Sequence, residues 1–402
     1  MIKKLLKPSF ILGFVLALQV LVLCLFKTGF VPSFTLDSSN MDALGIAVYF
    51  FFSIASFVIL HALSSQEIES IDPCLTSQDC DALVDQRKLL FIVRFLLLLS
   101  VLGCLYLLGL TMPGYSVPEY FQACISNQIK FSLDLANGPL HLFLVFPMVN
   151  SVLTPLRSGI KWRGPLLLNI VCLALLSTIF GSRILFFEGL ICSAVVLCSR
   201  FPLNIKLTVK SVATGAVISL AVFLIFATTS GLRDYEFEGY LYTDSPIVWG
   251  VSRVLDYPCS TLIYTSHFID LASIPGNIFN VFPSLERISF FSELLELSDT
   301  TPFLAEFGKA YYTNLGCFPE LVYKTGLWSV VIALSLIVSC ARLYKDYCEG
   351  SLAGLLFYPF FLYGLLEYWR TFHLGYELIQ IALLLLLFIY AYIKPSEKRK
   401  RC

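Results

Sequence analysis

Charge is scarce in this sequence. Of its 402 residues, 14% are Asp, Glu, Lys or Arg, whereas 57% are hydrophobic, and the mean hydropathy is +0.79. A soluble domain with this composition would expose large apolar patches to water. The composition therefore excludes a soluble protein and indicates a polytopic membrane protein. The 28 basic and 28 acidic residues cancel, so the net charge gives no reason to expect a nucleic-acid partner.

Metal-ligand spacings and glycosylation sequons are also missing. The chain has four histidines, and six of its thirteen cysteines lie in or directly beside apolar runs, with no cysteine pair at zinc-ligand spacing beside histidines. We therefore expect the thiols to pack as small hydrophobic groups, and we expect no metal or other cofactor. No Asn-x-Ser/Thr sequence occurs, which favours a bacterial inner membrane over a membrane of the secretory pathway.

Apolar runs fill most of the chain. Each is long enough to approach the thickness of the hydrocarbon layer, about 30 Å, as a helix. They cover about 9–26, 43–63, 89–110, 139–153, 165–180, 184–197, 209–229, 326–341, 351–368 and 378–393. The predicted fold is an all-α polytopic membrane protein with about ten transmembrane helices.

The distribution of basic residues predicts the orientation of these helices. With the N-terminus in the cytoplasm, most of the 28 lysines and arginines fall in inner segments, including the C-terminal Lys398, Arg399, Lys400 and Arg401. Both termini are then cytoplasmic, and a long loop at 230–323 is periplasmic. The predicted organisation is residues 1–229 with helices one to seven, the loop at 230–323, and residues 324–402 with helices eight to ten and a basic tail.

The long loop carries helix-start signals of its own. Ser245-Pro246 is typical of an N-cap followed by proline in the first turn, and Ile247, Val248, Val251, Leu255, Cys259 and Leu262 then recur at helical spacing. Thr301-Pro302 repeats the same signal. We therefore expect interfacial amphipathic helices that form a lid over a cavity.

Ionisable residues at the ends of apolar spans are costly and mark candidate sites. Under this topology one group lies at or near the outer ends of different spans: His141, Arg183, Glu188, Glu367, Arg370 and His373. They are expected to converge on one outward-facing cavity. The alternative is local pairing, because Glu367 and Arg370 are three residues apart on one helix and Arg183 lies near Glu188.

Arginine and tyrosine dominate the polar residues of the outer side. Guanidinium groups bind phosphate oxygens bidentately, so Arg183, Arg233, Arg253 and Arg370 suit a lipid-linked phosphate or pyrophosphate. Tyrosines such as Tyr257 and Tyr311 suit stacking on sugar rings. For most of these tyrosines, an interfacial aromatic belt is the competing interpretation.

This pattern resembles a known family. The outer hairpin at Gly181-Ser182-Arg183, a long outer loop opened by Ser230-Gly231-Leu232-Arg233, and the re-entry at 312–316 are similar to bacterial O-antigen polymerases of the Wzy type. The resemblance implies a metal-independent glycosyltransferase with a GT-C-like fold. It implies a periplasmic reaction on undecaprenyl-pyrophosphate-linked oligosaccharides, membrane lipid around the protein, and a possible chain-length regulator as partner. The family's pyrophosphate-binding arginines would match Arg183 and Arg233, with looser matches at Arg253 and Arg370.

The expected reaction needs a group that accepts the proton of an attacking sugar hydroxyl. The candidates are Glu367, His373, Glu306, Asp256 and His267. Two other functions stay open. An O-antigen ligase would share the donor and the arginines, whereas a flippase for lipid-linked oligosaccharides would need charges through the whole depth of the bundle and repeated halves.

Overall fold

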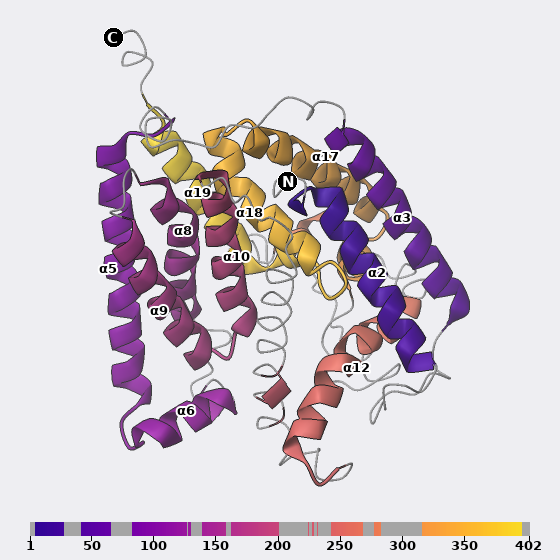
Figure 1. Cartoon of the computed structure of the whole chain (residues 1–402), viewed down its shortest axis with the longest axis horizontal. Coiled ribbons are helices and arrows are strands. Elements are labelled where there is room, and N and C mark those ends of the chain that lie inside the picture. Colours follow the sequence, from indigo (N-terminus) through magenta and orange to yellow (C-terminus); the bar gives the residue numbers. More distant parts are fainter. Residues whose placement is uncertain are drawn as a thin grey trace, which may run out of the picture.

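The fold was examined in a computed structural model (Figure 1). It describes residues 5–27, 42–65, 83–126, 128–129, 139–157, 162–200, 224, 227–228, 231, 243–267, 277–282 and 316–395. All regular elements in these ranges are helical, in agreement with the predicted all-α class. In chain order they are α2 (Pro8–Lys27), α3 (Ala43–Ser65), α5 (Gln86–Thr111), α6 (Val117–Ile125), η2 (Pro139–Leu144), α8 (Val145–Leu153), η3 (Thr154–Leu156), α9 (Arg163–Ile179), α10 (Arg183–Arg200), α12 (Pro246–Ser266), η5 (Ile278–Val281), α16 (Cys317–Thr325), α17 (Trp328–Cys348), α18 (Leu352–Leu366), η7 (His373–Gly375) and α19 (Glu377–Ile393).

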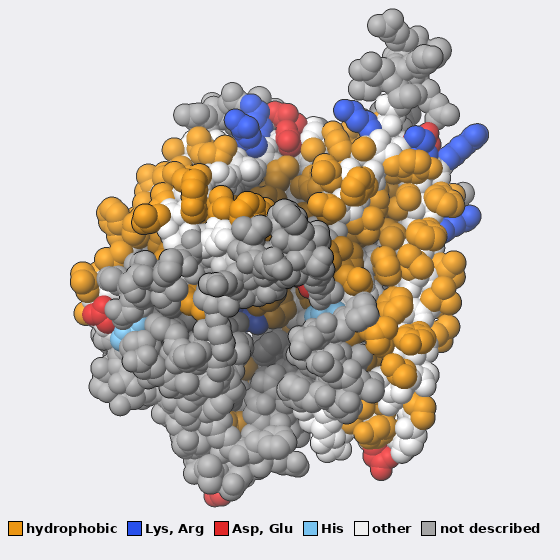
Figure 2. All heavy atoms as spheres, turned by 180° about the vertical axis from the view of Figure 1, so that it is seen from behind, with side chains coloured by type: hydrophobic (Ala, Val, Ile, Leu, Met, Phe, Trp, Pro, Cys, Tyr) orange, Lys and Arg blue, Asp and Glu red, His pale blue; other side chains and the backbone are white. Residues whose placement is uncertain are grey.

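Within the described residues, four helices are long and apolar enough to cross a membrane: α2, α3, α5 and α17. Other apolar helices, such as α9, α18 and α19, are shorter. Large hydrophobic side chains are exposed on helices of both groups, including Phe51 of α3 at 68%, Leu167 of α9 at 66% and Phe388 of α19 at 67%. Figure 2 shows hydrophobic side chains spread widely over the described part of the face in view. These helices fit a membrane protein. The predicted number of ten spans stays a prediction, since the run at 209–229 falls almost entirely outside the described residues.

The helices have two distinct ends. At one end, the backbone N–H of Asp85, just before α5, donates to the carbonyl of Ile393 at the end of α19 (2.9 Å). At the other end, the Thr111 hydroxyl lies 2.6 Å from that of Tyr120, which ties the last turn of α5 to α6. We call these the α19 end and the α6 end, and Figure 1 shows them on opposite sides. In Figure 2 the lysine and arginine side chains gather mainly toward the α19 end.

The direction of α10 follows from contacts at its last residue. The Arg200 guanidinium donates to the carbonyl of Arg157 (2.8 Å), and Gln86 at the start of α5 donates to the carbonyl of Leu156 (3.3 Å). Arg200 therefore lies at the α19 end. The first turn of α10, after the tight connection at Gly181, points toward the α6 end. Gly181 has a φ of +61°, a left-handed conformation that glycine adopts without strain.

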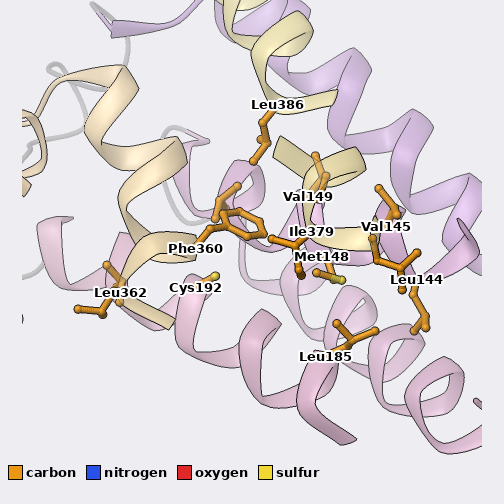
Figure 3. Close-up of a cluster of buried hydrophobic side chains, with 14 of the residues drawn as sticks. Leu144, Val145, Met148, Val149, Leu185, Cys192, Phe360, Leu362, Ile379 and Leu386 are labelled. Atoms are coloured by element: carbon orange, nitrogen blue, oxygen red, sulfur yellow. The ribbon is translucent and has the colours of Figure 1, made fainter. Parts of the chain in front are cut away.

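The central core packs four helices together. Figure 3 shows its side chains projecting from η2 and α8, α10, α18 and α19. The labelled residues, each at most 8% exposed, are Leu144, Val145, Met148, Val149, Leu185, Cys192, Phe360, Leu362, Ile379 and Leu386. A glycine lets α10 approach α9, because a Cβ at Gly189 would meet a methyl of Leu173 at 2.2 Å. The core is therefore built from close helix contacts, as in other membrane bundles.

A polar network crosses this core. Asn169 on α9 donates to the carbonyl of Pro147 (2.9 Å) and to the hydroxyl of Ser151 (3.1 Å). Its carbonyl accepts from the amide of Asn150 (3.2 Å). Both asparagines are fully buried. Interhelical hydrogen bonds of this kind hold apolar helices together where burial alone provides little attraction.

Replacing Asn169 tests this network. Asn169→Ala should lower the free energy of unfolding in detergent by about 1–2 kcal/mol, because three bonds between α8 and α9 are lost. Leu167→Ala, two residues away on the exposed face of α9, is the matched control and should have little effect. Thermal unfolding of the purified protein measures both. Equal losses in the two variants would contradict a special role of the network.

The long loop contains the predicted helix at Ser245-Pro246, with one difference. The backbone N–H of Val248 donates to the Ser245 hydroxyl (3.4 Å), so α12 starts as expected. Its buried side includes Trp249 and Leu262, both 0% exposed, whereas Ile247 is 57% exposed. The difference is that Trp249, which the predicted stripe did not include, is buried, and α12 packs against α2 and α3. The predicted helix at 301–302 lies outside the described residues.

Candidate functional site

The candidate site is built around the chain reversal between α18 and α19. Helix α18 ends at Leu366, and the chain turns back through η7 before α19 begins at Glu377. The reversal carries three of the predicted site residues, Glu367, Arg370 and His373. Because α19 has 17 residues, about 25 Å of helix, at 1.5 Å per residue, separate the reversal from Ile393. The site therefore lies toward the α6 end.

His373 forms a buried pair with Glu188 of α10. The imidazole Nε2 lies 3.1 Å from the Glu188 Oε1, and the two side chains are 1% and 0% exposed. Neither side chain makes a well-oriented hydrogen bond to another described residue. The approach of Nε2 to Oε1 is therefore the closest polar contact of this pair within the described residues. The rings of Tyr363 and Tyr376 flank the imidazole at centroid distances of 4.9 Å and 5.8 Å. An imidazole and a carboxyl group so arranged can share one proton.

A second ion pair lies on the same reversal. The Arg370 guanidinium donates to the Glu367 Oε2 (3.0 Å), which is the local i,i+3 pairing that the spacing predicts. The other carboxylate oxygen, Oε1, accepts from the Tyr363 hydroxyl (3.0 Å). Both oxygens of Glu367 are thus engaged. The Tyr363 hydroxyl also lies 3.1 Å from the carbonyl of Ile184, which connects the reversal to the first turn of α10.

An apolar cavity borders His373. Its volume is about 80 Å³, and it is partly open to the outside. The walls come from α2, α3, α16, α17, α18 and the reversal, with mostly aliphatic and aromatic side chains such as Leu60, Leu336 and Phe361. His373 and Ser56 are among its few polar lining residues. The cavity suits an apolar group placed next to the imidazole.

The other predicted site residues are not brought together by the described coordinates. Glu306, Arg233 and Tyr311 lie outside the described residues. Arg183 starts α10, and Arg253 and Tyr257 belong to α12, but the description covers only their backbone. The backbone of Arg183 is adjacent to Ile184 and therefore close to Tyr363. The further base candidate Asp256 likewise has only its backbone in α12, whereas His267 directly follows that helix.

Sequence reasoning placed Glu188 in the outer group but gave it no role. Its approach to His373 joins two segments far apart in the chain, which no local pattern indicates. Tyr363 was missed as well, although its i,i+4 spacing from Glu367 is a usable signal. His141 does not join the pair, because its ring packs against Phe180 at a centroid distance of 5.0 Å.

The described residues contain no group of three or more His, Cys, Asp or Glu side chains that could hold a metal ion. The sequence does contain one Asp-x-Asp triplet, Asp79-Cys80-Asp81, a pattern that some sugar-nucleotide enzymes use. It lies outside the described residues, in a segment that the topology prediction places on the inner side.

Scans of the chain against protein-family models, curated proteins and solved structures each found no match.

A double-mutant cycle tests the buried pair independently of any activity. Glu188→Leu or His373→Leu alone leaves the other group buried without its partner and should lower the free energy of unfolding by about 3 kcal/mol. The double variant should lose clearly less than the sum, by at least about 1 kcal/mol. Thermal unfolding in detergent measures all three variants, with Glu349→Leu at the exposed end of α17 as a control. Additive losses would mean that the two groups do not interact.

Proposed function

We propose that this chain is a glycosyltransferase of the bacterial inner membrane that joins oligosaccharide repeat units carried on undecaprenyl pyrophosphate, as an O-antigen polymerase does. The Glu188–His373 pair carries the proposal, because two fully buried ionisable groups are costly in a bundle this apolar. Ionisable groups buried among membrane helices usually mark a functional site.

The proposed reaction is a single displacement at a sugar carbon. An acceptor hydroxyl oxygen forms a bond to the anomeric carbon of the donor sugar, and the bond from that carbon to the pyrophosphate oxygen breaks. His373 takes the hydroxyl proton, and the Glu188 carboxylate stabilises the imidazolium that results, as the acid does in other carboxylate–histidine pairs. Glu367 is the weaker candidate for the base, since both of its oxygens already accept hydrogen bonds.

Negative charge develops on the departing pyrophosphate. A guanidinium group presents a planar fork of N–H donors that matches phosphate oxygens, and it keeps its charge in a partly dry site. Arg370 is therefore assigned to the leaving group, together with Arg183, Arg233 and Arg253 as sequence-based candidates. Interactions that strengthen as this charge grows lower the barrier rather than merely tighten substrate binding.

The apolar surroundings support a lipid-linked donor. The cavity beside His373 has apolar walls, and its helices α3 and α17 are two of the four long enough to span a membrane. A polyprenyl chain could reach this cavity from the bilayer. The grouping of basic residues at the opposite, α19 end supports placing that end in the cytoplasm and the site on the periplasmic face.

Deleting the gene from its own strain tests the proposed reaction class. Loss of a polymerase should leave lipopolysaccharide with one repeat unit on the core, which gel electrophoresis shows directly. Bare core would instead identify a ligase, and precursor retained on the inner face would identify a flippase. Either pattern would replace the proposed function, and so would an unchanged ladder.

The assigned residues are tested by complementing the deletion strain with gene copies that carry single substitutions. His373→Gln and Arg370→Lys should each lower polymer formation by at least about 10²-fold, the first for lack of a base and the second because an ammonium cannot reproduce the guanidinium fork. Arg342→Lys, the same change at an exposed arginine of α17, is the matched control. Immunoblots establish equal membrane levels. Full-length ladders from either site variant would disprove the assignment.

A further inference from the structure

A short helix holds the reversal that carries the site. Helix α16 contributes Glu320, whose carboxylate Oε2 accepts from the backbone N–H of Phe372 (2.7 Å) and from the hydroxyl of Thr371 (2.7 Å). The Glu320 side chain is only 16% exposed. Hydrogen bonds to a charged acceptor in such a setting are among the strongest that a protein makes. These two bonds fix the residues immediately between Arg370 and His373.

The start of α16 adds backbone contacts to the same segment. The N–H of Gly316 donates to the carbonyl of Arg370 (3.0 Å), and the N–H of Cys317 donates to the carbonyl of Tyr368 (2.9 Å). Gly316 has a φ of +87°, and a Cβ there would approach the Thr265 hydroxyl at 3.0 Å. Glycine thus permits the close approach. Four hydrogen bonds from α16 and its N-cap therefore hold the chain from Tyr368 to Phe372.

We infer that Glu320 is a positioning residue for the proposed glycosyl transfer: by holding residues 371 and 372, it sets where Arg370 and His373 stand relative to the reacting atoms. The inference rests on the proposed function and adds a residue that sequence patterns did not suggest. Glu320 does not itself contact Arg370 or His373 in the bonds above, so it acts through the backbone. A displacement of about 1 Å at a reacting group can cost on the order of 10²-fold in rate.

Helix α16, which begins within the last residues of the predicted loop at 230–323, also contacts an earlier part of that loop. The N–H of Asn277, which caps η5, donates to the carbonyl of Lys324 at the end of α16 (3.1 Å). Gln380 of α19 donates to the carbonyl of Val281 in η5. Part of the predicted lid segment is therefore attached to the helix that holds the site. Glu320 lies where these two parts meet.

The second oxygen of Glu320 has a different partner. Its Oε1 lies 2.7 Å from the Lys324 ammonium, one turn along α16, and the lysine side chain is 24% exposed. Partly exposed pairs at i,i+4 contribute little to stability. Lys324→Met therefore removes this ion pair and leaves both bonds to the reversal intact. It is the matched control for changes at Glu320.

The experiment compares Glu320→Ala, Glu320→Gln, Thr371→Val and Lys324→Met in purified, detergent-solubilised full-length protein. The substrate is the lipid-linked repeat unit extracted from the deletion strain. Glu320→Ala should lower kcat by on the order of 10²-fold, with KM changed far less, because Arg370 and His373 are displaced from the reacting atoms but still present. Glu320→Gln keeps one acceptor oxygen and should recover a large part of the loss. Thr371→Val should fall between wild type and Glu320→Ala, and Lys324→Met should match wild type.

Hydrogen–deuterium exchange gives a readout that does not need the reaction. Amides in the 368–376 peptide should exchange faster in Glu320→Ala than in Lys324→Met, while peptides of α5 stay unchanged. Normal kcat with unchanged exchange in Glu320→Ala would overturn the inference, and so would a Glu320→Gln variant as impaired as Glu320→Ala. Should the alanine variant fail to fold, Thr371→Val decides by the same two measurements. Absence of transfer by wild-type protein would refute the proposed function instead, and exchange would still test the positioning role.

Discussion

The buried contact between Glu188 and His373 constrains the rest of the structure. Removing two ionisable side chains from water costs several kcal/mol for each charged group, and mutual attraction offsets that cost only when the geometry is close. The two groups come from different helices, so α10 and the reversal after α18 must stay in register to keep 3.1 Å between them. An apolar pair of similar volume would hold the helices together without this cost. The presence of an ionisable pair at this position therefore favours a chemical role over a purely structural one.

Several neighbouring contacts serve to keep this register. Tyr363 reaches both Glu367 and the carbonyl of Ile184, and thus connects α18 with the first turn of α10. On the far side of α10, the Ser193 hydroxyl lies 3.0 Å from the carbonyl of Ser151, within the polar network of α8 and α9. Close packing at Gly189 completes the contact. The position of Glu188 is thereby fixed from both sides of its helix.

The sequence was informative where structure depends on near neighbours. Apolar runs predicted α2, α3 and α5, the Ser245-Pro246 signal predicted the start of α12, and three-residue spacing predicted the Glu367–Arg370 bond. It was uninformative where contact depends on tertiary packing. The topology placed Glu188 and His373 in one outer group, but nothing near position 188 selects His373 as its partner. Nothing near Glu320 indicates that its Oε2 accepts from the backbone N–H of Phe372. The burial of Trp249 on α12, a helix that packs against α2 and α3, was likewise not indicated by the local apolar pattern.

The depth at which ionisable groups occur in the bundle distinguishes a transporter from an enzyme that acts at one membrane face. A transporter must lower the barrier for a polar cargo along its whole path, so it needs polar or charged contacts through the bundle. In the described part of this chain, the paired ionisable groups Glu188, His373, Glu367 and Arg370 lie together toward the α6 end. Deeper polar residues such as Asn150 and Asn169 are neutral and bonded to one another. A reaction at one face, by contrast, needs only an ionisable cluster beside an apolar cavity. The arrangement therefore favours chemistry at an interface over passage through the protein.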